Sequence, residues 1–132
     1  MRILCSYCSA AKRRDEAPLP AIERYESARL RALWRQGRST GAPLHILSGE
    51  YGLVTPDAPL PWYDHLLTMD EVAPMVMRVA AQLRAAGVTA VEYHTAAVAV
   101  APPVAPYLAV VRAACERAGA ELAIVELAGD PA

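Results

Sequence analysis

Four short apolar runs alternate with three longer amphipathic stretches along this chain of 132 residues. The runs lie at residues 2–8, 44–48, 88–94 and 122–127, and each has the length and composition of a buried strand. Strands that alternate with helices form a parallel sheet, joined by right-handed crossovers and covered by helices on both faces. The pattern predicts an α/β fold, a three-layer α/β/α sandwich. Its four-stranded parallel sheet has the order 2-1-3-4, with strands numbered along the sequence.

The three amphipathic stretches repeat apolar side chains at helical spacing and end at typical stop signals. They are residues 21–36, 68–86 and 104–118, and a glycine follows each of them. Thr68 and Glu71 form a capping-box pattern at the head of the second stretch. The sequence therefore predicts three helices with defined ends, within a single domain over residues 1–132 that finishes in a short tail at 128–132.

The segment 48–64 differs from the rest of the chain because small, acidic and aromatic residues suddenly replace an apolar run. Gly49 and Gly52 permit tight turns, and three prolines stiffen the second half of the segment. A connection of this length is uncommon in a compact domain unless it binds something. The segment therefore predicts a pre-organised site, whose candidate groups are Glu50, Tyr51, Tyr63 and Asp64.

Further polar residues follow the other strands and, in a parallel sheet, converge on the same edge. Ser6, Ser9 and Lys12 are candidates for holding phosphate through hydroxyls, loop amides and one positive charge, with a serine-rich turn as the alternative. A P-loop NTPase and a dinucleotide enzyme are excluded, because neither glycine-rich motif is present. Cys5 and Ser48 complete the candidate ligand-binding set.

Glu50, Asp64 and His94 are the candidate catalytic residues. Either carboxylate is suited to act as general acid or base, to bind a ligand, or to bond the loop's own amides. His94, at a strand mouth, is a candidate acid or base, or a histidine satisfied by a neighbour. Tyr51 and Tyr63 are candidates for stacking on a planar base, whereas Trp62 is expected in the core.

Composition and charge add limits. Residues 1–38 carry nine basic against four acidic side chains, and residues 39–132 carry four against ten, so the net charge of −1 hides a dipole. The basic part suits phosphate or nucleic acid, or is a solvated helix face.

Cys5, Cys8 and Cys115 lack the spacing of a disulfide framework, which favours structural thiols over redox or metal roles. No metal or cofactor is expected. With neither a signal-peptide pattern nor an apolar run long enough for a membrane span, we expect a cytoplasmic protein with no membrane partner.

Four segments resemble a small bacterial family of unknown function whose members are labelled YaaA-like, after a peroxide-stress protein. They are Cys5-Ser6 with Lys12, residues 19–25, the motif Ser48-x-x-Tyr51-Gly52-Leu53 and the motif Pro61-x-Tyr63-Asp64. The resemblance implies DNA binding and a part in peroxide stress. Related domains accompany nucleobase-modifying proteins, and the strand pattern is similar to uracil-DNA-glycosylase-like or Rossmann-like folds.

These residues support three functional hypotheses. The first is an enzyme acting on a nucleotide or nucleic-acid base, by hydrolysis or transfer at an N-glycosidic bond. The second is a non-catalytic nucleic-acid-binding domain of the YaaA-like stress-response kind, and the third is a structural domain of a larger assembly. Their partners would be, respectively, a nucleobase-containing small molecule, nucleic acid and other proteins.

Overall fold

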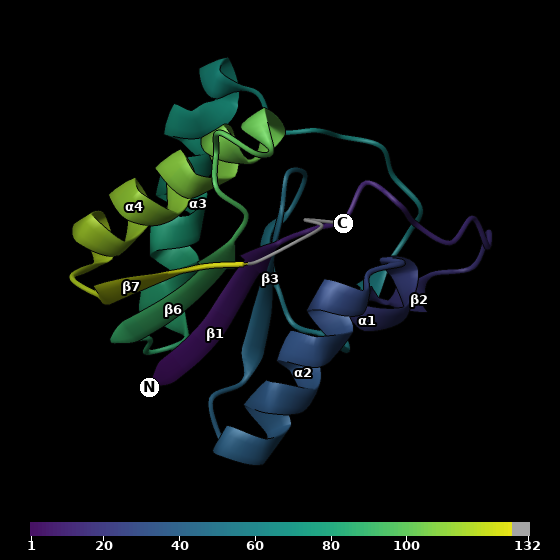
Figure 1. The fold of residues 1–132 in the computed structure, drawn as a ribbon, viewed down its shortest axis with the longest axis horizontal. Helices are drawn as coiled ribbons and strands as arrows, with labels where there is room; N and C mark the ends of the chain where they lie inside the picture. The colour runs from purple at the N-terminus through teal and green to yellow at the C-terminus, as the bar shows by residue number, and fades with distance from the viewer. Residues whose placement is uncertain (128–132) are drawn as a thin grey trace.

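The computed structural model describes residues 1–127, so the predicted tail at 128–132 lies outside the described residues. It contains a central sheet with helices packed against it (Figure 1), which confirms the α/β class. The strands are β1 (Arg2–Tyr7), β2 (Leu19–Pro20), β3 (Leu44–Ser48), β4 (Gly52–Val54), β5 (Pro59–Leu60), β6 (Ala90–Thr95) and β7 (Glu121–Glu126). The α-helices are α1 (Ala21–Arg24), α2 (Ala28–Thr40), α3 (Val72–Ala85) and α4 (Ala105–Ala118). Two 3₁₀ turns, η1 (Met69–Glu71) and η2 (Pro102–Val104), precede α3 and α4.

The central sheet has five strands in the order β4-β3-β1-β6-β7. Its strands β3, β1, β6 and β7 are parallel, and β4 is antiparallel to β3. The prediction of a four-stranded, all-parallel sheet was therefore wrong in omitting β4. A turn places Gly52 at a φ of 74°, which reverses the chain onto the edge of β3. A strand of three residues carries too little alternation to be recognised from sequence.

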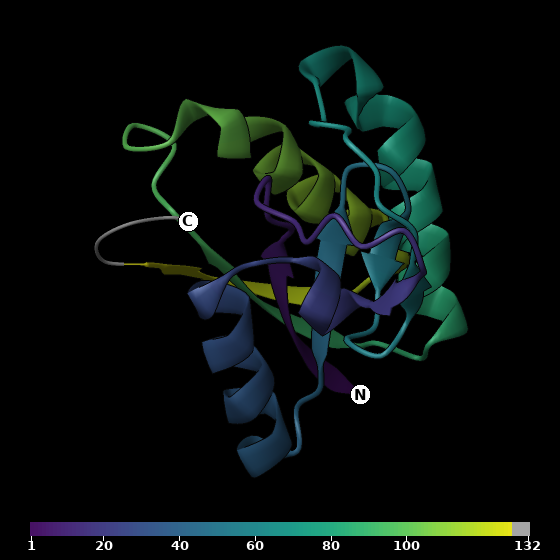
Figure 2. The same ribbon diagram turned by 90° about the vertical axis from the view of Figure 1, so that its right-hand side faces the viewer.

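Apolar side chains cover both faces of the sheet and form two cores. Along β1, Ile3, Cys5 and Tyr7 face the core beneath α3 and α4, whereas Leu4 faces the core beneath α1 and α2. Figure 2 shows α2 on one side of the sheet and α3 with α4 on the other. The architecture is thus three layers, with β1 buried at its centre.

The predicted helix over residues 21–36 is interrupted, which corrects the sequence interpretation. Tyr25 is extended and pairs with Lys12 in an isolated antiparallel bridge. Ser27 then caps a new helix, because its hydroxyl accepts a hydrogen bond from the Leu30 amide at 3.2 Å. The helix also continues past the predicted stop at Gly37 and ends at Gly41, whose φ is 75°.

The other two helices begin and end near the predicted signals. The capping box of Thr68 and Glu71 is present and opens η1, which leads directly into α3. Glycines follow both α3 and α4, at Gly87 and Gly119, with φ of 69° and 72°. Among the described residues, no helix has the length and apolar character needed to cross a membrane.

Arg24 ties the segments around α1 together. Its side chain is fully buried and donates hydrogen bonds to the backbone carbonyls of Arg13, Asp15, Ala17 and Leu60 at 2.7–3.2 Å. The antiparallel pairing of β2 with β5 lies in the same region. The loop after β1 and the proline-rich part of segment 48–64 are therefore fixed to each other.

Candidate functional site

A cavity of about 390 Å³ lies at the carboxyl-terminal edge of the sheet, where the loop after β1 meets the segment between β6 and α4. The chain leaves β1 toward α2 on one face of the sheet and leaves β6 toward α4 on the other. Such a divergence of connections is where open α/β sheets bind ligands. The cavity is lined by residues 7–12, Arg29, residues 64–66, Ala101, Pro103, Val104 and Tyr107.

Gly49 allows three parts of the chain to meet beside this cavity. A Cβ atom at Gly49 would lie 2.7 Å from the His65 carbonyl oxygen and 2.9 Å from Tyr107 Oη. Tyr107 Oη in turn accepts a hydrogen bond from the Leu67 amide at 3.1 Å. Only glycine therefore lets the turn after β3 approach segment 65–67 and α4 this closely.

Ser48 fixes the start of that turn. Its buried hydroxyl accepts hydrogen bonds from the amides of Glu50 and Tyr51, both at 3.1 Å, and lies 2.8 Å from Tyr63 Oη. Tyr63 Oη is also hydrogen-bonded to Tyr25 Oη. Burial is the main cause that raises the pKa of both phenols, so they join this chain of hydroxyls as neutral groups.

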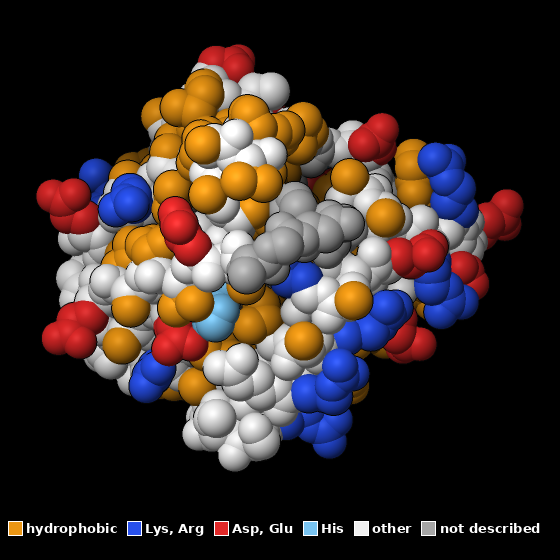
Figure 3. All heavy atoms as spheres, viewed as in Figure 1, with side chains coloured by type: hydrophobic (Ala, Val, Ile, Leu, Met, Phe, Trp, Pro, Cys, Tyr) orange, Lys and Arg blue, Asp and Glu red, His pale blue; other side chains and the backbone are white. Residues whose placement is uncertain are grey.

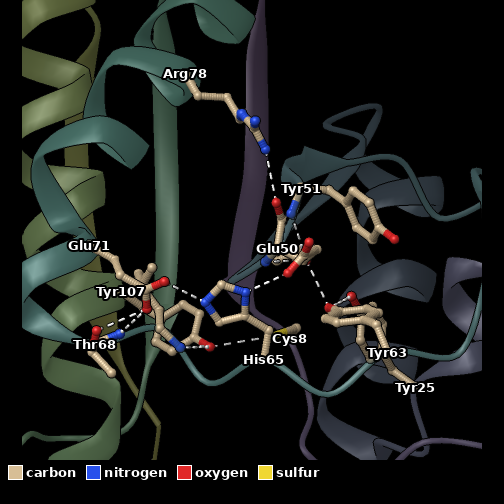
Figure 4. A network of polar contacts seen from close by, with 12 residues as sticks. Cys8, Tyr25, Glu50, Tyr51, Tyr63, His65, Thr68, Glu71, Arg78 and Tyr107 are labelled. Carbon is tan, nitrogen blue, oxygen red and sulfur yellow. Dashed lines mark hydrogen bonds and ion pairs between the residues drawn. The ribbon is translucent and has the colours of Figure 1, made fainter.

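Glu50, His65 and Glu71 form a second polar chain at the rim (Figure 4). His65 Nδ1 is hydrogen-bonded to Glu50 Oε2, and His65 Nε2 lies 2.6 Å from Glu71 Oε2. The Glu50 carbonyl oxygen accepts a hydrogen bond from Arg78 at 2.8 Å, which anchors the turn to α3. One imidazole thus joins the loop after β3 to the head of α3.

The charges along this chain reinforce one another. The hydrogen bond to Glu50 is the largest cause that raises the pKa of His65 above its ordinary 6.5, and Glu71 adds to it. The Thr68 backbone amide is the largest cause that lowers the pKa of Glu71. Both carboxylates therefore favour the imidazolium form of His65, in which both ring nitrogens are donors.

Lys12 and Asp64 bring opposite charges to the cavity. Lys12 Nζ lies 4.7 Å from the centre of the Tyr63 ring, over its face. Within residues 1–127, neither the Lys12 ammonium nor the Asp64 carboxylate has an ion-pair partner. Both groups therefore keep their charge available for a ligand.

Arg29 forms part of the cavity wall below the loop after β1. It donates hydrogen bonds to Ser6 Oγ at 2.7 Å and to the Tyr7 carbonyl oxygen at 2.8 Å, and its guanidinium carbon lies 3.9 Å from the centre of the Tyr7 ring. Ser6 Oγ itself donates to the His94 carbonyl oxygen at 2.6 Å. Hydrogen bonds thus join the end of β1 to α2, through the partly buried Arg29 side chain, and to β6, through Ser6.

The structure brings some of the predicted site residues together and separates others. Ser9, Lys12 and Asp64 line the cavity. Glu50 is hydrogen-bonded to His65, which lines the cavity. Tyr51 packs edge-on against Tyr63 with ring centres 5.3 Å apart. The residues whose side chains are buried in the fold away from the cavity lining are Cys5, Ser6 and Ser48.

His94 lies apart from the residues that line the cavity. Its Nε2 atom is 2.8 Å from Glu92 Oε2, and Glu92 also pairs with Arg2 at 2.6 Å. In the parallel register, Leu4 of β1 lies opposite Glu92 and Ser6 lies opposite His94. Leu4 belongs to the core beneath α2, so His94 and Glu92 lie on the face of the sheet that α2 covers. The expectation of a histidine satisfied by a neighbour describes this arrangement, and Trp62, expected in the core, is 40% exposed instead.

Four polar or aromatic lining residues did not emerge from sequence reasoning as site candidates: Tyr7, which ends the first predicted strand, and Arg29, His65 and Tyr107. Arg29 and Tyr107 lie within helical patterns, where an arginine and a tyrosine are read as surface and core. His65 directly follows the Pro61-x-Tyr63-Asp64 motif, so its position beside a predicted loop carboxylate was an available signal. Its partner Glu71 was recognised only as a helix cap.

Among the described residues, no group of three or more His, Cys, Asp or Glu side chains is arranged to hold a metal ion. The three cysteines are free thiols, and burial raises the pKa of Cys5 and Cys115, the latter to about 11. Comparison of the chain with protein-family models, with curated proteins and with solved structures gave no significant match.

Proposed function

We propose that this protein is an enzyme that acts on a nucleotide or nucleic-acid base, by hydrolysis or transfer at an N-glycosidic bond. One observation carries the proposal: one cavity at the carboxyl edge of the sheet is bordered by two tyrosine rings and by a lysine and a carboxylate that have no ion-pair partner among residues 1–127. These are the residues Lys12, Asp64, Tyr7 and Tyr107.

The binding side of the proposal rests on size and chemistry. A volume of about 390 Å³ suits a small ligand, and sites of this kind are mostly apolar with a few placed polar groups. Tyr7 and Tyr107 are largely buried, and the parts of their rings that line the cavity give it an aromatic wall for a planar base. Lys12, supported by the hydroxyl and amides of the loop at Ser9, offers a positive charge for phosphate.

The chemical side rests on Asp64 and Glu50. When an N-glycosidic bond breaks, its electron pair leaves with the base, and positive charge develops at the sugar carbon. A carboxylate stabilises that charge or activates the attacking water, as pairs of carboxylates do in glycoside hydrolysis. Asp64 lines the cavity and takes this role. Glu50 is the second carboxylate. It is hydrogen-bonded to His65 and positions that imidazole in the wall of the cavity.

The finer fold assignment belongs to the same proposal. A ligand site at the divergence between β1 and β6 is the arrangement expected of a Rossmann-like or uracil-DNA-glycosylase-like fold. Such a likeness supports nucleotide chemistry by analogy, and the side chains in the cavity provide the independent argument.

A second candidate function, non-catalytic nucleic-acid binding, is favoured by α2. Arg31, Arg35 and Arg38 are exposed at helical spacing, and the space-filling view shows basic side chains gathered over α1 and α2 (Figure 3). Arg31 and Arg38 border a larger hollow of about 690 Å³ against the loop at Pro56. Phosphate-driven binding here would weaken steeply with added salt.

Asp64→Asn tests the proposed activity, with Glu116→Gln on the exposed side of α4 as the control. The assay follows base release from nucleosides, nucleotides and oligonucleotides of each common base. We expect Asp64→Asn to keep the melting temperature and ligand affinity near those of the parent. It should lower turnover by about a hundredfold or more, the low end of general acid–base contributions.

Two outcomes would count against this function. Unchanged turnover in Asp64→Asn would remove the carboxylate from the chemistry. Absence of base release from every substrate, combined with binding that disappears between 50 and 200 mM salt, would favour the nucleic-acid-binding alternative.

A further inference from the structure

A second hollow adjoins the cavity and has different chemistry. It has a volume of about 350 Å³ and shares with the cavity the residues Ala10, Ala11, Lys12 and Asp64. Its far side is formed by Arg14, Trp62 and Glu26. The two hollows are therefore neighbouring compartments of one groove, and Lys12 and Asp64 lie at the boundary between them.

Trp62 makes this second hollow a ready stacking surface. The side chain is 40% exposed, so part of its ring surface is open to a ligand. The Arg14 guanidinium carbon lies 4.9 Å from the centre of the Trp62 ring, over one of the two ring faces. Proteins that bind single-stranded nucleic acids combine an exposed aromatic ring, on which a base stacks, with positive charge that attracts the phosphate backbone.

We infer that the second hollow binds the nucleotide next to the target nucleotide, so that the substrate is a nucleic-acid strand or dinucleotide and not a free mononucleotide. This inference rests on the proposed function. The target base occupies the cavity, the neighbouring base stacks on Trp62, and the phosphate that links them lies at Lys12, which borders both compartments.

Charge in the groove agrees with this arrangement. Lys12 and Arg14 lie on the path of a linking phosphate and its neighbour. Glu26 and Asp64 are acceptor-only carboxylates; Asp64 faces the sugar of the target nucleotide, and Glu26 is suited to accept hydrogen bonds from the amino group of a stacked base. A mononucleotide would leave Arg14, Trp62 and Glu26 without a ligand.

The chain offers a matched control for the Arg14–Trp62 pair. On α2, the Arg38 guanidinium carbon lies 5.0 Å from the centre of the ring of Trp34, a partly buried residue of the larger hollow, so a second arginine–tryptophan pair exists outside the groove. Trp62→Ala and Trp34→Ala therefore remove the same type of side chain from two different surfaces. Arg14→Gln provides a second variant that retains the tryptophan.

The test measures dissociation constants at fixed salt for 5′-phosphorylated homodinucleotides of each common base, in deoxy and ribo forms, beside the matching mononucleotides. In the parent protein, at least one dinucleotide should bind more tightly than its mononucleotide. Trp62→Ala should weaken that dinucleotide by about 5- to 150-fold, as stacking of one base predicts, and leave the mononucleotide within twofold. Arg14→Gln should act in the same direction, and Trp34→Ala should change neither.

The outcomes separate this inference from the proposed function. Mononucleotides that bind and release base, with dinucleotides no tighter and no effect of Trp62→Ala, would overturn the second compartment and leave the activity standing. Dinucleotides that depend on Trp62 but release no base would support the compartment and remove the glycosidic activity. Absence of binding by every probe would overturn both.

Discussion

At the scale of single residues, His65 links the two charged segments of the site. Both of its ring nitrogens face carboxylates, Glu50 on the loop after β3 and Glu71 at the head of α3. An imidazole in this position binds its proton more tightly in the folded protein than in the unfolded chain, because both neighbours favour the charged form. The residue thus makes the rim of the cavity sensitive to pH.

An NMR titration of the His65 ring should give a pKa above 6.5, and Glu71→Gln should lower it by removing one of its two partners. Because the folded-state pKa is raised, the stabilisation is fully present below the unfolded value near 6.5 and is lost as pH rises through the folded pKa. Amide exchange at residues 49–51 should accelerate over the same interval. A His65 pKa at or below 6.5 would contradict the ion-paired rim.

Gly49 is the second residue on which the site depends. Gly49→Ala places a Cβ atom 2.7 Å from a backbone oxygen, which cannot move without displacing segment 65–67. We expect a loss of about 1–3 kcal/mol in the free energy of unfolding, as for overpacked sites. Gly41→Ala is the contrasting variant, because its cost comes from a φ of 75° and not from crowding: a Cβ atom there would meet nothing within 4 Å beyond its chain neighbours. Denaturant unfolding of both variants checks this, and a Gly49→Ala protein as stable as the parent would refute the close contact.

At the scale of elements, sequence patterns succeeded where local signals decide the structure. The long parallel strands and helices α3 and α4 follow from apolar periodicity and from caps such as Thr68 with Glu71. The break between α1 and α2 was missed because Tyr25 pairs with Lys12, thirteen residues earlier in the chain, and helical periodicity contains no trace of that contact. Sequence reasoning found Asp64 in segment 48–64 and Lys12 in the loop after β1 but missed Tyr107, because tertiary contacts bring α4 to the site.

Arg24 shows how a residue that looks like helix surface organises an element. Arg24→Met should leave the buried Leu60 carbonyl without a hydrogen-bond donor, at a cost of about 1–3 kcal/mol. It should also remove the part-buried hydrogen bonds to the carbonyls of Arg13, Asp15 and Ala17. We expect a marked fall in melting temperature and faster hydrogen exchange around residues 11–26 and 58–60.

Arg35→Met, on the exposed side of α2, is the matched control and should melt close to the parent. Equal stability of the two variants would mean that Arg24 does not hold these segments together.

At the scale of the whole molecule, two basic regions compete as ligand sites. One is the groove at the carboxyl edge, with Lys12 at its centre, and the other is the larger hollow along α2 with Arg31 and Arg38. Volume alone favours the second, since it measures about 690 Å³ against about 390 Å³. Chemistry favours the first, because it combines the diverging strand connections, aromatic walls and a carboxylate, Asp64, that has no ion-pair partner in the described part of the chain.

The measurement that most directly tests this account is a map of amide chemical-shift changes in the ¹⁵N-labelled protein as a nucleoside monophosphate or dinucleotide is added. We predict saturable changes at residues 7–12, 64–67 and 101–107, with the stretch 31–43 of α2 and its following loop nearly unaffected. Changes confined to residues 31–43 and 56–57 would place the ligand along α2 and contradict a nucleotide site at the edge of the sheet.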